Sequence, residues 1–407
     1  MSKIQKASGN YLILGSSTNS ITPINPATYT NLDTSLNMAV DFINVSAVDS
    51  KGLVYVGGGF STIGGVPANN VAVYNPVTNL WSSLGTGVDN SVRAITIDAS
   101  DNVYFGGLFS TAGGVSSYGI ARWNSDSSSW SPIGGPDFKF VLSIKINPYN
   151  SNVYVGGIFT AIGPSSTPAS YMAIYNPSSN TWSQFSGGAD SPVTGFVFSP
   201  TNIYICGYFS QVNGIPNFNS IASYDVSTDS WSPFGTGFNS ICNTMIGVGN
   251  LLYVGGQFTS ANGDVSNQYI AQINTTTGVY SALPGGPANT VVALASDTNN
   301  NILYVGGFFF VPTAPPNSLG FAKWNPATSP WSTDGSGAIN IFGSSGVNGL
   351  TLTSLNNLYV TGLFTTFNGF ASSAIVLVNY YQQFSQTSTF YLPLRKSLSK
   401  KWIKLNK

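Results

Sequence analysis

The sequence contains no histidine and no glutamate, and all fourteen of its acidic residues are aspartates. Without these two residue types the chain lacks the commonest general base and one of the two carboxylic acids that glycosidases use. Imidazole ligands for zinc or copper are missing as well. We therefore expect no histidine-dependent catalysis, no imidazole-based metal centre and no cofactor.

Charge is scarce and unevenly placed. Only 7% of the residues are charged, whereas an average soluble domain has about 25%. Residues 1–394 carry a net charge of −6, and the last thirteen residues hold six Lys or Arg. This pattern predicts an N-terminal extension at 1–10, a body at 11–394 and a basic tail at 395–407. The candidate binding residues of the tail are Arg395, Lys396, Lys400, Lys401, Trp402 and Lys404.

Long apolar runs and cysteines are also rare. No stretch approaches the eighteen apolar residues of a transmembrane helix, and Tyr11–Leu14 is too short for the core of a signal peptide. The expectation is a cytoplasmic or virion-associated chain, with the compartment itself left open. Cys206 and Cys242 are too few for a disulfide scaffold, and we interpret both as small buried side chains.

Glycine and aromatic residues, by contrast, recur with a period of about fifty residues. A Tyr-x-x-Gly element repeats at intervals of 49 to 55 residues, with its tyrosine at Tyr55, Tyr104, Tyr154, Tyr204, Tyr253, Tyr304 and Tyr359. A phenylalanine follows each tyrosine by five positions, at Phe60, Phe109, Phe159, Phe209, Phe258, Phe309 and Phe364. A second signature ends in an aromatic residue, as in Asn75–Trp81 and Asn176–Trp182, and a third is typified by Val92–Ile97. Such a period indicates a repeat architecture.

Each repeat reads as four short strands bounded by turn residues. The pairs Gly64–Gly65 and Asn213–Gly214 suit a tight hairpin with positive φ between the second and third strands. Asn75–Thr78 suits an Asx turn between the third and fourth strands. No segment shows sustained helical periodicity. The prediction is an all-β protein formed by a single β-propeller of four-stranded blades.

These residues resemble the kelch family, the propeller type of the central domain of galactose oxidase. The resemblance lies in Tyr-x-Gly-Gly followed by Asn/Asp-Pro-x-Thr-x-x-Trp, as in Tyr55–Gly58 and Asn75–Trp81. The Gly-Gly-x-Phe-Thr segments look more like repeats of fungal cortical-marker proteins and of uncharacterised bacterial and giant-virus proteins. The resemblance implies a binding or surface role. It carries no catalytic residue onto this chain, because the copper site of galactose oxidase needs histidines.

The number of blades has two interpretations. Kelch propellers often begin at strand two and end at strand one, and Tyr11–Gly15 and Phe390–Leu394 fit those places in an eighth blade. Eight blades of fifty residues account for the chain and are slightly favoured. Pro393 argues against this reading, because it would remove an N–H from an inner strand. The alternative is a seven-bladed ring closed by residues near Tyr29–Leu32.

The function predicted from these features is a non-catalytic propeller that acts as a macromolecular binding scaffold through its loops. A protein partner or self-association is expected first, and carbohydrate is possible. Nucleic acid or a membrane would be bound only through the basic tail. The seven repeated phenylalanines either pack between blades or form an exposed aromatic ring for a partner. The alternatives are a structural surface component of a virion or cell exterior and an aspartate-dependent carbohydrate-active enzyme.

Overall fold

The computed structural model describes residues 11–13, 21–33, 36, 41–136, 138–312, 319–326, 331–333, 337–339, 346–383 and 391–393. The chain divides into two compact units. The larger unit spans Thr28–Val378 and therefore lies inside the predicted 11–394 body. The other combines Met1–Ala27 with Asn379–Lys407, and in it β1 (Tyr11–Ile13) pairs antiparallel with β40 (Tyr391–Pro393).

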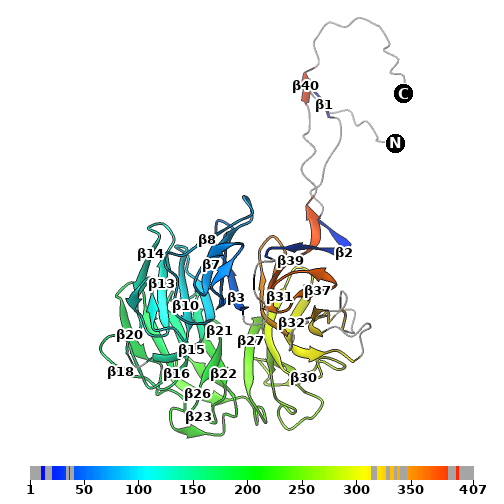
Figure 1. The fold of residues 1–407 in the computed structure, drawn as a ribbon. Coiled ribbons are helices and arrows are strands. Elements are labelled where there is room, and N and C mark those ends of the chain that lie inside the picture. Colours follow the sequence, from blue (N-terminus) through cyan, green and yellow to red (C-terminus); the bar gives the residue numbers. More distant parts are fainter. Residues whose placement is uncertain are drawn as a thin grey trace, which may run out of the picture. The chain divides into compact units, whose positions relative to one another are not determined.

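The large unit consists of antiparallel sheets that follow one another in chain order (Figure 1). In five of them all four predicted strands are present. The first two are β3 (Phe42–Val48), β4 (Val54–Gly59), β7 (Val71–Asn75), β8 (Leu80–Ser83), and β9 (Val92–Ile97), β10 (Asn102–Gly107), β13 (Ile120–Asn124), β14 (Ser129–Pro132). The third is β15 (Phe138–Ile146), β16 (Val153–Phe159), β19 (Met172–Asn176) and β20 (Thr181–Gln184). The fourth and fifth are β21 (Val193–Phe198), β22 (Asn202–Gly207), β25 (Ile221–Asp225), β26 (Ser230–Pro233), and β27 (Cys242–Val248), β28 (Leu251–Gly256), β29 (Ile270–Asn274), β30 (Tyr280–Ala282).

The last two blades depart from this pattern. Blade six has three strands in its described residues: β31 (Val291–Asp297), β32 (Ile302–Phe310) and β33 (Leu319–Trp324). Blade seven takes its outermost strand from the start of the chain. Its order is β35 (Gly346–Leu352), β36 (Asn357–Leu363), β39 (Ile375–Gln383) and β2 (Ile21–Asn31).

Short hairpins lie between the second and third strands of most blades. They are β5 (Thr62–Ile63) with β6 (Val66–Pro67), β11 (Thr111–Ala112) with β12 (Val115–Ser116), β17 (Ala161–Ile162) with β18 (Thr167–Pro168), and β23 (Gln211–Val212) with β24 (Ile215–Pro216). In blade seven, β34 (Ala338–Ile339) joins β37 (Thr366–Phe367) and β38 (Phe370–Ala371). The predicted turns are confirmed here, since Gly64, Gly65, Asn213 and Gly214 all have positive φ. The Asx turn is confirmed too, with Asn75 Oδ1 accepting the N–H of Val77 at 2.9 Å.

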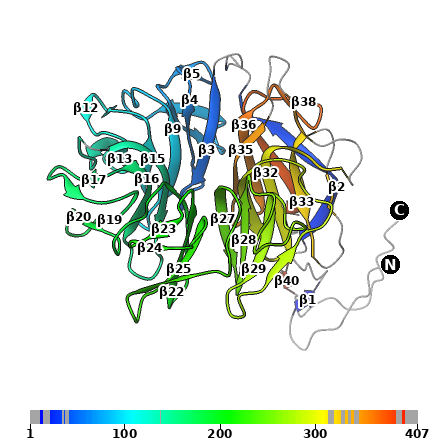
Figure 2. The same cartoon turned by 90° about the horizontal axis from the view of Figure 1, so that it is seen from below.

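The first strand of each blade lines the centre of a closed ring. These strands contact one another in the order β3, β9, β15, β21, β27, β31, β35, and β35 in turn contacts β3 (Figure 2). Across that closure Thr351 Oγ1 donates to the carbonyl of Ser46 at 2.8 Å. The described part of the large unit is therefore a β-propeller of seven blades, without a helix.

The preference for eight blades is wrong for the described residues. Residues 21–31 form the outermost strand of blade seven instead of starting a separate blade. The segments assigned to an eighth blade, at Tyr11 and near Tyr391, pair only with each other in a two-stranded sheet. The hydrogen bonds between β2, near the start of the chain, and β39, near its end, join the two ends of the ring.

Two residue types explain why blades pack closely. The glycine three positions after each repeated tyrosine lies against backbone: a Cβ on Gly107 would stand 2.2 Å from the Ser91 carbonyl oxygen. The aromatic residue of the fourth strand spans the junction between blades. Trp130 Nε1 donates to the Leu84 carbonyl at 2.8 Å, and Trp182 Nε1 donates to the Ile133 carbonyl at 2.8 Å.

Candidate binding surface at the channel mouth

The repeated phenylalanines are part of the core. Phe60, Phe109, Phe159, Phe209, Phe258, Phe309 and Phe364 are all between 0% and 4% exposed. A partner could not reach them in the folded chain, so the interpretation as an exposed aromatic ring is corrected. The period places these rings between blades because each follows the glycine doublet at the end of a buried second strand. The packing interpretation agrees with this placement.

The residue before the phenylalanine is a large apolar side chain exposed to solvent in four of the seven copies. We name Leu108, Ile158, Tyr208 and Phe308 the mouth ring, and they are 43%, 40%, 42% and 39% exposed. Large apolar side chains with this exposure recur in four of seven copies of one position. The remaining copies are Gly59, Gln257 and Leu363. Each mouth-ring residue directly precedes one of the repeated phenylalanines, and the sequence alone does not show which of two adjacent side chains faces outward.

Backbone hydrogen bonds fix the mouth ring in place. The N–H of Leu108 donates to the Ser91 carbonyl, and that of Tyr208 donates to the Pro192 carbonyl, both at 2.9 Å. Both acceptors immediately precede an innermost strand. The ring of Phe308 lies over Gly346, the first residue of the next innermost strand, because a Cβ there would be 2.4 Å from the ring. These contacts place Leu108, Tyr208 and Phe308 beside the starts of innermost strands, at one end of the central channel.

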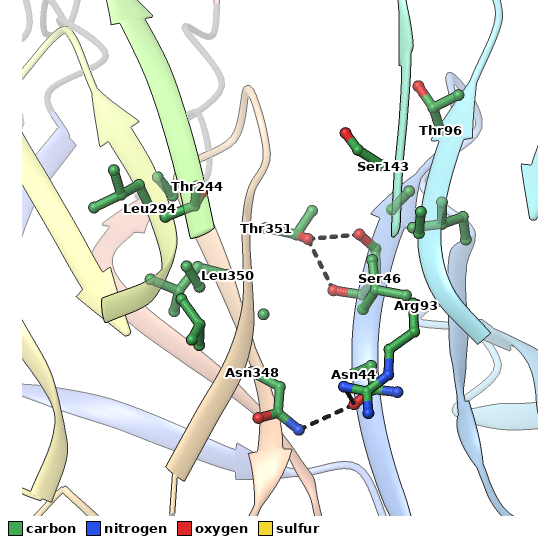
Figure 3. Close-up of a pocket in the computed structure, with 18 of the residues that line it drawn as sticks. Asn44, Ser46, Arg93, Thr96, Ser143, Thr244, Leu294, Asn348, Leu350 and Thr351 are labelled. Carbon is green, nitrogen blue, oxygen red and sulfur yellow. Dashed lines mark hydrogen bonds between the residues drawn. The ribbon is translucent and has the colours of Figure 1, made fainter. Parts of the chain in front are cut away.

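A β-bulge near the start of the innermost strands turns one side chain per blade into the channel. In blades one and two the bulged residues are Asn44 and Arg93. Asn44 Nδ2 donates to the Val92 carbonyl at 2.7 Å, and Arg93 donates to Asn44 Oδ1 at 3.4 Å (Figure 3). Burial raises the pKa of the Tyr208 phenol, and the nearby positive charge of Arg93 opposes that rise. Arg93 thus brings a positive charge to the mouth ring.

The aspartates are occupied by local hydrogen bonds. Asp225 Oδ1 accepts the N–H of Ser227 and Thr228, and Asp297 Oδ1 accepts that of Asn299 and Asn300. The hydroxyl and N–H of Ser227 hold the pKa of the Asp225 carboxyl below its usual range. Among the described residues, no three metal-binding side chains lie together. The described part of the chain also contains no helix long and apolar enough to cross a membrane.

The two cysteines form a disulfide that sequence reasoning missed. Cys206 lies on β22 and Cys242 on β27, so the bond joins blades four and five, with a Cα–Cα distance of 5.7 Å. Both side chains are fully buried as expected, but they are not independent fillers. Alignment of the repeats contains the signal. Gly57 abuts Val92 of the following blade, and Cys206 and Cys242 occupy those same two positions.

Comparison with known families identifies the repeat. Residues 12–139 and 135–250 match the family described as the Rax2 C-terminal beta propeller domain. Together these two matches span more than half of the 407 residues. The chain belongs to the Rax2 C-terminal beta propeller domain family. This family assignment agrees with the observed propeller.

Solved structures share the fold of this family member at low sequence identity. The extracellular domain of BT4673 from B. thetaiotaomicron is 14% identical over 86% of this chain, with a TM-score of 0.56, and this chain covers 39% of that one. The WD40 repeats of RRP9 are 10% identical, with a TM-score of 0.56, over 88% of this chain and 99% of that one. Curated protein sequences yield no match. These similarities establish the propeller fold alone.

The basic tail lies outside the described residues. This applies to all of its candidate binding residues, Arg395, Lys396, Lys400, Lys401, Trp402 and Lys404.

Proposed function

We propose that this chain is a non-catalytic, kelch-like binding scaffold that holds a protein partner against the mouth ring. The observation that carries the proposal is the contrast between neighbours. At one repeated position phenylalanine is buried at 4% exposure or less, and one residue earlier Leu108, Ile158, Tyr208 and Phe308 are about 40% exposed. Exposed aromatic and aliphatic side chains gathered around an arginine are typical of the energetic centre of protein interfaces.

Folding does not require these apolar side chains. The position tolerates Gly59 and Gln257 in other blades, and its anchoring bond is made by the backbone. Leaving large apolar groups in water has no benefit for a monomer, and contiguous patches of them usually mark interaction sites. A protein partner that covers the mouth ring would bury them.

The aspartates support the non-catalytic part of the proposal. A glycosidase needs one carboxyl group whose pKa is raised so that it can donate a proton. Among the described aspartates, every shifted pKa is lowered, at Asp89, Asp101, Asp190, Asp225 and Asp264. Carboxyl groups of this kind stay ionised at neutral pH and serve as hydrogen-bond acceptors.

The test is a comparison of affinity capture by variants of the full chain. The double variant Tyr208→Ala, Phe308→Ala removes two members of the mouth ring. The matched control is Val77→Ala, an 86% exposed residue in the turn between the third and fourth strands of blade one. We expect a protein captured by the wild type and the control to be lost from the double variant by tenfold or more. Equal capture by all three proteins would refute the proposal, and capture of the chain alone would favour a structural layer.

A further inference from the structure

The central channel is a cavity with the dimensions of a ligand site. Its volume is about 540 Å³, within the range of about 300–1,000 Å³ typical of small-molecule sites. All of the innermost strands contribute to its wall, which is rich in hydroxyl and amide groups (Figure 3). The polar groups of the wall include Ser46, Thr96, Ser143, Thr244, Asn348 and Thr351.

The charge of the wall is of one sign. Arg93 and Lys145 line the cavity, and no aspartate is among its lining residues, although the chain has fourteen. The chain has only fourteen Lys and Arg, and two of them lie in this one channel without a carboxylate. The channel therefore concentrates uncompensated positive charge. A channel lined by one sign of charge raises the local concentration of ions of the opposite sign.

Lys145 is the more informative of the two cations. Among the described residues, no hydrogen bond or ion pair joins its ammonium group to another side chain or to the backbone. Its side chain reaches the interior of the channel, where surrounding protein lowers its pKa by desolvation. The residue is exposed to the solvent-filled channel, so its charge is open to a ligand there.

The repeat shows that the fold does not need a lysine at this position. Lys145 lies directly across the sheet from Tyr154. The residues across from the equivalent tyrosines are all neutral: Ala47, Thr96, Val197, Ile246, Ala295 and Thr351. Six blades therefore fold with a neutral side chain at a place where blade three has a charge. A role in binding accounts for the difference where packing does not.

Arg93 lies nearer to the entrance. It precedes Thr96, the residue equivalent to Lys145, by three positions, which is roughly 10 Å along a strand. Its contact with Asn44 Oδ1 is to a neutral amide and leaves its charge uncompensated. The two cations thus stand at successive depths along one path, first at the mouth and then inside.

We propose that the channel binds a small oxyanion, either free phosphate or the phosphate group of a small molecule, with Lys145 as its counter-charge and Arg93 at the entrance. Lysine is a common phosphate ligand because it presents a compact charge with three donors, and arginine offers a planar fork of donors. The neighbouring serine and threonine hydroxyls supply further hydrogen bonds. This site is independent of a protein partner at the mouth ring.

The test titrates the full chain with inorganic phosphate and, separately, with glycerol phosphate. Binding is measured by calorimetry and by phosphorus NMR. Sodium chloride at matched ionic strength controls for screening, and acetate controls for charge alone. We expect saturable phosphate binding to the wild type and to Lys139→Met, which removes an exposed lysine that does not line the channel. Lys145→Met should weaken binding by at least tenfold, and Arg93→Gln should weaken it less. Binding of glycerol phosphate but not of free phosphate would assign the site to a phosphate ester.

Two further measurements separate binding from folding. Lys145→Thr introduces threonine, the residue that blade two has at the equivalent position, Thr96. The variant should fold, and its melting temperature in phosphate-free buffer should be equal to or higher than that of the wild type. Phosphate should raise the melting temperature of the wild type and not that of Lys145→Thr. The proposal is wrong if the wild type binds neither phosphate compound, or if Lys145→Met and Lys145→Thr bind them as the wild type does.

Discussion

Trp81 Nε1 donates a hydrogen bond of 2.9 Å to the backbone carbonyl of Leu32, and this contact joins the first blade to the strand that completes the last one. Equivalent bonds join the other junctions, as from Trp130 to Leu84 and from Trp231 to Ser186. The same side chain that packs within a blade thus also closes the ring. Indole N–H groups supply a directional contact of this kind at five junctions, and the hydroxyl of Tyr280 donates to the Phe234 carbonyl at the junction of blades four and five.

Substitution of Trp81 by phenylalanine should open the closure locally. The change keeps an aromatic ring but removes the N–H, which leaves the Leu32 carbonyl without its donor and costs about 1–3 kcal/mol of unfolding free energy. Chemical denaturation measures this cost, and hydrogen exchange should rise in Tyr29–Asn31. Trp182→Phe is the control, because it breaks the equivalent bond to Ile133 at an internal junction. Unchanged exchange in Tyr29–Asn31 would show that the bond does not hold the closure.

The disulfide should be inert in the native state and important for stability. Cross-linking residues 36 apart is worth about 4 kcal/mol in the chain-entropy model, so Cys242→Ser should destabilise the chain by an amount of that order. The double variant Cys206→Gly, Cys242→Val introduces the pair found at the equivalent positions Gly57 and Val92. It should lose less unfolding free energy than Cys242→Ser, because the valine side chain fills the space of the removed sulfur atoms. Denaturation midpoints measure both effects. A native wild type that reacts as two free thiols would contradict the assignment.

Acid should weaken the links between blades that use aspartate. Asp89 Oδ1 accepts the N–H of Ser110 at 2.7 Å and of Thr111 at 2.9 Å. Burial would raise the pKa of Asp89, but these bonds outweigh it and the pKa is lowered. A lowered folded pKa means that the stabilisation is present above the ordinary carboxyl value of about 3.9 and is lost as the pH falls. Melting temperatures between pH 6 and pH 2 should show this loss.

The chain contains its own control for this acid effect. At the equivalent junction, Asn239 Oδ1 accepts the N–H of Thr259 at 2.9 Å and of Ser260 at 3.0 Å. Asp89→Asn should therefore keep the two backbone bonds and reduce the acid sensitivity, with little change of melting temperature at pH 7. A large loss of stability at pH 7 would mean that the negative charge itself is required.

Alkaline pH should destabilise the chain through its buried tyrosines. Burial raises the pKa of Tyr55 and of Tyr359 to about 12. A folded pKa above the unfolded value of about 10 means that stability is complete below pH 10 and is lost as the pH rises toward 12. Absorbance of tyrosinate should appear together with loss of the circular-dichroism signal. Tyr55→Phe should reduce the dependence on pH, and ionisation of all tyrosines in the native chain would exclude this coupling.

The blades follow from short-range features of the sequence. Strand order, the Gly64–Gly65 turn and the Asx turn at Asn75 depend on residues that are neighbours in the chain, and the fifty-residue period repeats the same local solution. The burial of the repeated tyrosines fits the same period, whereas the sequence alone left open whether the phenylalanines pack between blades or face a partner. Local hydrogen bonds and alternation of side chains are sufficient for such predictions.

The closure of the ring and the surface that it exposes depend instead on contacts between blades. The bond between Ser46 and Thr351 joins residues 305 apart, and no local pattern shows whether the strand at Tyr29 ends one blade or follows another. Which of Tyr208 and Phe209 faces water depends on the twist and packing of neighbouring blades. The pairing of Cys206 with Cys242, and the meeting of Arg93 and Lys145 in one channel, likewise require blades to be placed around a common axis. Contacts between blades set these features, and a repeat that specifies each blade alone does not encode them.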